Sequence, residues 1–147
     1  MKKLQFVLFV AILNLHFTCK KDVILLAGTS ISLELKQEVN SEQVERGNII
    51  EFLVKNNVTV GGQVVITAGS SAEGIVKDVV KLCRGCNANC AKVTITVENV
   101  QTVDGQRIYL RSIPHSETTD CKGWKPAVVK IGTAVSAKVL NNATIAI

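Results

Sequence analysis

The chain has 147 residues and a formal net charge of +5, with 17 basic residues against 12 acidic ones. This length suits a single domain with one hydrophobic core. The basic residues alternate with apolar ones, as in Lys77-Asp78-Val79-Val80-Lys81. We therefore interpret them as a solvated strand face and expect no nucleic-acid partner.

Residues 1–18 have the organisation of an export signal. Met1-Lys2-Lys3 is basic, and Leu4–Leu15 is an apolar run too short to cross about 30 Å of hydrocarbon as a helix. Cys19 follows this run, and its thiol can carry a diacylglycerol anchor with palmitate-like acyl chains. The pattern predicts a signal peptide over 1–18 and lipidation of Cys19. The alternatives are a secretory signal cut elsewhere and an uncleaved anchor.

The residues around Cys19 depart from the common lipobox, because His16 and Thr18 stand where it has Leu and a small residue. With Lys20-Lys21-Asp22 behind it, the box resembles the looser ones of Bacteroidota lipoproteins. The resemblance implies a membrane partner reached through the lipid. Lys20 in place of the Asp that retains lipoproteins in the inner membrane favours the outer membrane, either periplasmic or surface-facing.

The remainder of the chain has the pattern of β-strands. Apolar residues alternate with polar ones over Ile31–Lys36, Val93–Glu98 and Val135–Val139, as expected for strands with one buried face. Gly61-Gly62 and Asp104-Gly105 predict tight hairpins, since both need positive φ angles. The fold class expected is all-β, as a small closed or partly open barrel or a sandwich of short strands.

A short motif recurs three times and supports one closed domain. Each copy has an apolar residue, two intervening residues, Gly and then Thr or Ser, directly before a strand; the glycines are Gly28, Gly69 and Gly132. The glycine is expected to permit a turn or a strand kink. The organisation predicted is a signal peptide over 1–18, a lipidated cysteine and tether over 19–24, and one β domain over 25–147.

Four segments of this domain resemble a small β-module of the bacterial envelope. They are Gly62–Ser70, Gly74–Val76, Lys92–Val97 and Val103–Ile108. The likeness covers about residues 25–112, with Gly132-Thr133 onward as a final strand pair. It is similar to small Bacteroidota lipoproteins and, more weakly, to the barrel of TrbI-type conjugation scaffolds and the C-terminal domain of FlgT-like proteins. The resemblance implies a fold and no particular activity.

Four cysteines remain after Cys19: Cys83, Cys86, Cys90 and Cys121. In an exported chain, an even number predicts two disulfides. We expect one bridge inside the first loop, either Cys86–Cys90 or Cys83–Cys90, and one from that loop to Cys121. The alternative is a site of four thiolates for zinc, or for iron–sulfur or redox chemistry, and otherwise no cofactor is expected.

No catalytic constellation stands out, so we expect no enzyme and identify no small-molecule substrate. His115 with Ser112 or Ser116 is a poor basis for a triad, with Asp120 or Glu117 as the acid, because neighbours in one loop rarely reach that geometry. The function expected is a non-enzymatic structural or adaptor module that binds an envelope protein or cell-wall polymer. Its expected contact surface consists of the two loops that carry the cysteines, residues 83–90 and 112–126, together with Tyr109, His115 and Trp124.

Overall fold

The computed structural model describes residues 21–83, 90–119, 121 and 124–147. Within these ranges the chain forms strands, turns and loops, and the all-β prediction is confirmed. The strands are β1 (Asp22–Leu25), β2 (Ser30–Leu35), β3 (Val39–Asn40), β4 (Ile49–Val54), β5 (Val58–Val60), β6 (Gln63–Ile66), β7 (Ser71–Val80), β8 (Lys92–Gln101), β9 (Arg107–Ser112), β10 (His115–Thr118), β11 (Val128–Val129), β12 (Ala134–Val139) and β13 (Ala143–Ala146).

Six strands close into an antiparallel barrel in the order β8, β7, β4, β2, β12 and β9. The ring closes because β9 pairs with β12 on one side and with the end of β8 on the other. β10 is an additional strand that pairs with the first part of β8. Of the two architectures that the sequence allowed, barrel and sandwich, the closed barrel is the one adopted.

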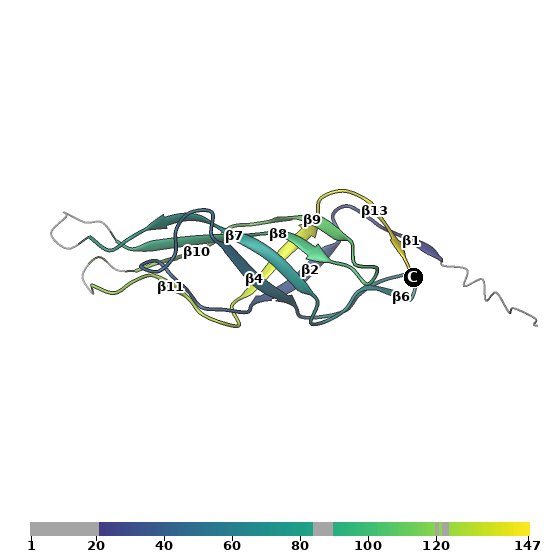
Figure 1. Cartoon of the computed structure of the whole chain (residues 1–147), viewed down its shortest axis with the longest axis horizontal. Coiled ribbons are helices and arrows are strands. Elements are labelled where there is room, and N and C mark those ends of the chain that lie inside the picture. Colours follow the sequence, from purple (N-terminus) through teal and green to yellow (C-terminus); the bar gives the residue numbers. More distant parts are fainter. Residues whose placement is uncertain (1–20, 84–89, 120, 122–123) are drawn as a thin grey trace, which may run out of the picture.

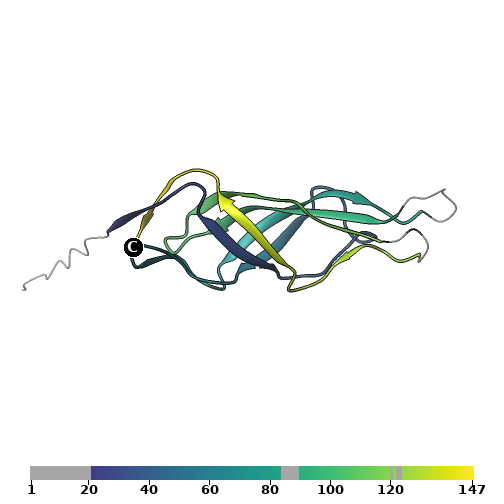
Figure 2. The same ribbon diagram turned by 180° about the vertical axis from the view of Figure 1, so that it is seen from behind.

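The molecule is elongated, and its two ends are built from different short sheets (Figures 1 and 2). One end carries the β1–β13 pair and the β5–β6 hairpin, together with the C-terminus. Toward the opposite end, β3 pairs with β11. The first strand begins at Asp22, ahead of the domain start expected at residue 25, because Lys21 and Ile147 exchange backbone hydrogen bonds.

Alternating burial along the strands produces the core. In β2, the side chains of Ile31, Leu33 and Leu35 are buried while those between them face outward. Phe52 of β4 is the largest fully buried side chain of the described residues. Each such apolar side chain contributes about 1.5–3 kcal/mol to stability. A one-residue slip in strand register would move a whole set to the surface, so register decides the core.

Glycine turns fix this register at the ends of the barrel strands. At the first, the Gly28 N–H donates to the Val139 carbonyl at 2.8 Å, and the Val139 N–H donates to the Thr29 carbonyl at 2.9 Å. One residue of a neighbouring strand is thus held from both sides, an arrangement we call a glycine clamp. Three more clamps follow the same pattern: Gly47–Asn48 on Val76, Gly69–Ser70 on Val54, and Gly132–Thr133 on Leu35.

Each clamp requires glycine for its backbone conformation. The four glycines have φ between 79° and 88°, a region that L-residues with a side chain rarely adopt. The three-fold motif in the sequence therefore corresponds to three clamps, as its turn interpretation predicted. The fourth clamp, at Gly47, was not predicted, because Asn48 stands where the other three motifs have Thr or Ser.

Both predicted hairpins are present, and the second is tied to the C-terminal strand. Gly61-Gly62 joins β5 to β6, and Asp104-Gly105 joins β8 to β9. Partial burial raises the pKa of Asp104, but hydrogen bonds from Thr102 and from the backbone of Ala146 and Gln106 outweigh it. The pKa of this carboxyl therefore lies below its ordinary value, and the charged form holds β13 against the hairpin.

Gly74 of β7 is required for a different reason, which is the close approach of other groups. A Cβ atom there would press against the Thr96 backbone carbonyl and would lie 2.8 Å from Cε2 of Phe52. Neither group can move away easily, since one is barrel backbone and the other fills the core. β7 can therefore lie this close to β4 and β8 only because residue 74 is a glycine.

Gly74→Ala is accordingly expected to destabilise the barrel by about 1–3 kcal/mol, the usual cost of overpacking a core. Chemical denaturation of the purified variant measures this difference. Gln101→Ala is the matched control, because Gln101 is an exposed residue of β8, and such substitutions usually stay within about 0.5 kcal/mol. Equal midpoints for the two variants would contradict the close-approach argument.

Candidate functional site

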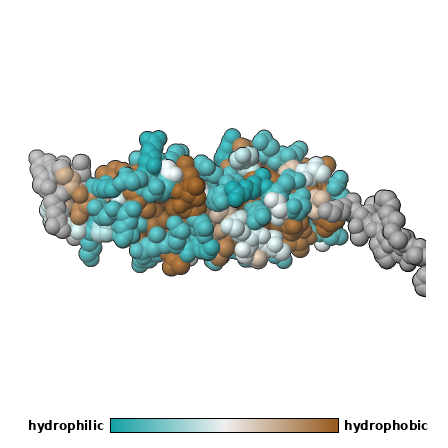
Figure 3. Space-filling model, in the orientation of Figure 1, coloured by the Kyte–Doolittle hydropathy of each residue, from teal (hydrophilic) through white to brown (hydrophobic). Residues whose placement is uncertain are grey.

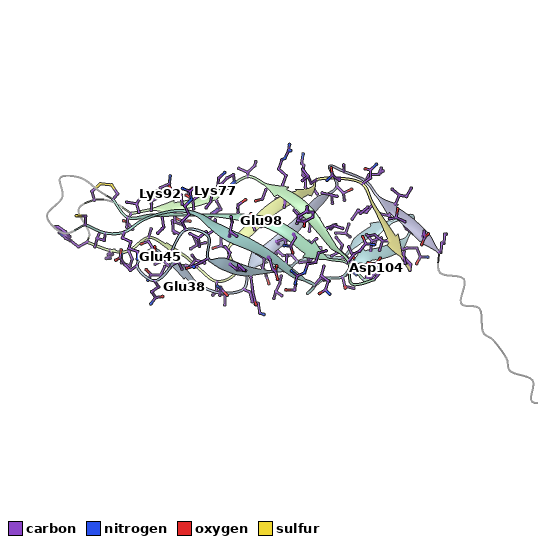
Figure 4. All side chains as sticks on the ribbon, turned by 45° about the horizontal axis from the view of Figure 1, so that its top comes forward. Glu38, Glu45, Lys77, Lys92, Glu98 and Asp104 are labelled. Carbon is purple, nitrogen blue, oxygen red and sulfur yellow. A yellow bond between two sulfur atoms is a disulfide. The ribbon has the colours of Figure 1, made fainter. Side chains whose placement is uncertain are left out.

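A disulfide closes the end of the barrel opposite β1, and we call this end the tip (Figures 1 and 4). It joins Cys90, just before β8, to Cys121 in the loop between β10 and β11, with Cα atoms 4.4 Å apart. The Thr119 N–H also donates to the Ala91 carbonyl at 3.0 Å. Together these bonds hold Thr119 and Cys121 against the start of β8.

The predicted bridge from the first cysteine loop to Cys121 is thus confirmed, but the local pairings were wrong. Cys90 is bonded to Cys121, so neither Cys86–Cys90 nor Cys83–Cys90 forms. The reason is that β10 pairs with β8, which brings Cys121 to Cys90. Cys83 is also disulfide-bonded, whereas Cys86 and the lipidation candidate Cys19 lie outside the described residues.

The disulfide also bears on the zinc alternative. A metal-binding cysteine must be a thiolate, so Cys90 and Cys121 are not ligands in this oxidised form. Over the described ranges, no group of three or more His, Cys, Asp and Glu residues is placed to hold a metal ion. A four-thiolate site stays a prediction for the reduced protein.

The three expected contact residues lie along β9, β10 and the loop that follows. Tyr109 is 67% exposed on β9, and Trp124 is 54% exposed in the loop at the tip. His115 starts β10, where its Nε2 lies 3.1 Å from Oε1 of Glu117. The three residues are spread along the barrel toward the tip and do not form a single cluster.

The serines considered as partners of His115 have other hydrogen bonds. The Ser116 hydroxyl bonds to that of Thr94 at 2.8 Å, and Ser112 Oγ accepts from the Val97 N–H at 2.8 Å. Ser116 also follows His115 directly in a strand, where successive side chains point to opposite faces. Asp120, one of the candidate acids, lies outside the described residues. No Ser–His hydrogen bond is formed within the described structure.

A seam beside β9 is the surface that sequence reasoning missed. β9 and β12 pair only over three registered positions. Pro114, which has no N–H, follows β9 at the point where the partner of β8 changes from β9 to β10. A hollow of about 400 Å³ lies there, lined by Arg111, Ser112, Ile113, Pro114, Ser136 and Lys138. Ile113 is 87% exposed. An apolar residue before Pro at the end of an alternating strand was the available signal.

Two cations face each other across this seam. Arg111 and Lys138 are directly opposite in the β9–β12 register, an arrangement that is unfavourable between like charges. Neither makes an ion pair with any residue that the structure describes. The seam therefore combines exposed apolar groups with uncompensated positive charge.

Cys121→Ser is expected to lower the unfolding temperature and to leave the Cys90 thiol titratable. The bridge closes a loop with a sequence separation of 31 residues, which in the chain-entropy model corresponds to about 3–4 kcal/mol. Calorimetry and thiol titration of the oxidised protein measure the two effects. The Cys90→Ser/Cys121→Ser variant should lose the same stability without the additional thiol. An unchanged unfolding temperature, or loss of a bound metal from Cys121→Ser, would contradict a purely structural bridge.

Comparison with known proteins does not identify a family for this chain. Over the described residues, no helix is both long and apolar enough to span a bilayer. The barrel alone does not identify a TrbI-type or FlgT-like relative, so that resemblance stays a prediction. No protein-family model and no curated protein sequence matches the chain.

Proposed function

We propose that this protein is a non-enzymatic lipoprotein of the outer membrane, anchored through Cys19, whose barrel is a structural or adaptor module of the cell envelope. The observation that supports this most directly is the polarity of the molecule. β1 and the C-terminus lie at one end, and the Cys90–Cys121 disulfide lies at the other (Figures 1 and 4). A lipid attached just before β1 would leave the tip directed away from that membrane.

The disulfide supports the proposed compartment. Structural disulfides form and persist in oxidising environments such as the periplasm and the cell surface. Here the bridge joins Cys121 to Cys90 outside the barrel core, which is filled by apolar side chains from the strands. A residue fixed in this way loses little conformational freedom when a partner binds beside it.

The contact surface that we propose runs from the seam to the tip. It comprises Tyr109, Ile113, His115 and Trp124, with Arg111 and Lys138 beside them. On the face of the molecule that Figure 3 shows, hydrophilic residues predominate and are interrupted by apolar patches. Large exposed apolar side chains next to charge are typical of sites that bind another macromolecule. The proposed partner is an envelope protein or a cell-wall polymer.

The anchoring is tested by the intact mass of the protein extracted from its own membranes. The expected mass is that of residues 19–147 plus acyl chains. Cys19→Ala should abolish the acyl mass and the outer-membrane location, whereas Cys121→Ser should retain both. A mass without acyl chains, from a chain cut at another residue or not cut at all, would refute the lipoprotein assignment and leave the barrel description intact.

The contact surface is tested by photo-crosslinking in growing cells. A photoreactive amino acid at Ile113 or Tyr109 is expected to give a discrete crosslinked product, because both side chains project from the proposed surface. The same amino acid at Gln63, an exposed residue of β6 near the β1 end, is the control. Identical products from all positions, or none from any, would contradict a specific surface between seam and tip.

A further inference from the structure

A second hollow gathers three basic side chains that are distant in the sequence. It has a volume of about 310 Å³ and is lined by Arg46, Lys77, Asp78, Lys92, Thr94, Pro114 and Ser116. These residues come from the turn before β4 and from β7, β8 and β10, with Pro114 directly before β10. Figure 4 labels Lys77 and Lys92, which lie close together on the half of the barrel near the tip. The volume is sufficient for a small charged group with part of its carrier.

Two irregularities of the backbone bring these cations together. The β7–β8 register shifts between Val76 and Asp78, so Lys77 is the extra residue of a β-bulge. Bulges redirect a side chain and are common beside functional sites. The Gly47–Asn48 clamp holds Val76 at 2.8 and 2.9 Å, which fixes Arg46 next to this bulge. In strands without this bulge and this turn, Arg46 and Lys77 would lie farther apart, which is what the alternating sequence predicts.

The positive charge of the hollow is only partly compensated. Lys92 lies 3.7 Å from the Asp78 carboxylate. Glu45, the nearest acid in sequence to Arg46, bonds to Lys81 instead. Arg46 and Lys77 make no ion pair with the described residues. Three cations against one carboxylate leave a site that an anion would stabilise.

Hydroxyl groups complete the lining of the hollow. Thr94 is only 7% exposed, and its hydroxyl lies 2.8 Å from that of Ser116. Their mutual hydrogen bond uses one of the two hydroxyl protons, and neither hydroxyl has another partner among the described residues. One proton therefore remains to be donated. A guanidinium, two ammonium groups and a hydroxyl provide more donors than a carboxylate can accept, and they suit the three or four oxygens of a phosphate.

We propose that the hollow formed by Arg46, Lys77, Lys92, Thr94 and Ser116 binds a phosphate group. The group is carried by a phosphorylated carbohydrate or by a lipid headgroup, which share this chemistry. Arg46 provides the fork of N–H donors, Lys77 and Lys92 provide charge, and the hydroxyl pair orients one oxygen. The site is independent of the proposed anchor, since every residue in it lies on β7, β8, β10 or the turn before β4.

The test is an NMR titration of the isotope-labelled full chain in a non-ionic detergent, at constant ionic strength, with inorganic phosphate. Saturable shifts are expected in the backbone amides of the lining residues. Arg46→Gln/Lys77→Gln should weaken binding by about tenfold or more, as expected when charge-assisted hydrogen bonds are lost. Lys55→Gln/Lys130→Gln removes the same charge from two exposed residues that line neither hollow, and it should change the affinity less than about twofold. Each single variant at Arg46 or Lys77 is a second probe if the double variant does not fold.

Two further ligands identify the source of the phosphate. Tighter binding of glucose 1-phosphate than of inorganic phosphate would support the site with a carbohydrate carrier. Tighter binding of micelles containing phosphatidylglycerol would support it with a lipid carrier. Shifts that do not saturate, that spread over all exposed lysines, or that persist in Arg46→Gln/Lys77→Gln would overturn the proposal.

Discussion

The glycine clamps are the constraint on which the rest of this structure depends. A one-residue slip of any barrel strand would turn its buried face to solvent, so the register has to be fixed where the strands begin and end. Each clamp holds one residue between an N–H group and a carbonyl of a turn that a positive-φ glycine makes possible. The buried faces of β2, β4 and β12 then follow, because those strands carry the clamped residues Leu35, Val54 and Val139.

The same device also shapes the surface. The clamp on Val76 belongs to the barrel framework, yet it also positions Arg46 beside the bulged Lys77. Close to this clamp, Pro114 follows β9 and contributes to the lining of both hollows. Regular pairing makes the barrel stable, and both hollows lie beside places where that pairing is broken, at Lys77 and at Pro114. Function on this fold is therefore expected where the ladder is broken.

Much of the fold could be predicted from the sequence because its signals are local. Alternation over Ile31–Lys36 and the Gly-Gly and Asp-Gly pairs depend on neighbouring residues, and these predictions were correct. Closure of the barrel and the pairing of Cys90 depend on contacts between distant segments. The sequence therefore did not decide between barrel and sandwich, and it predicted the wrong partner for Cys90. The basic hollow was missed for the same reason. Lys77 appears as an ordinary member of an alternating strand until the bulge and the Gly47 turn are known.

The pairing of β1 with β13 has a consequence for the way the chain folds. The first strand finds its partner only in the last one, and β2 likewise pairs with the late strand β12. No stable barrel can form from an incomplete chain, since its N-terminal strands would retain open edges until residues 134–146 arrive. Such non-local closure is slow. In the export that we propose for this chain, the same order of events would keep it unfolded until its final strand has crossed the membrane.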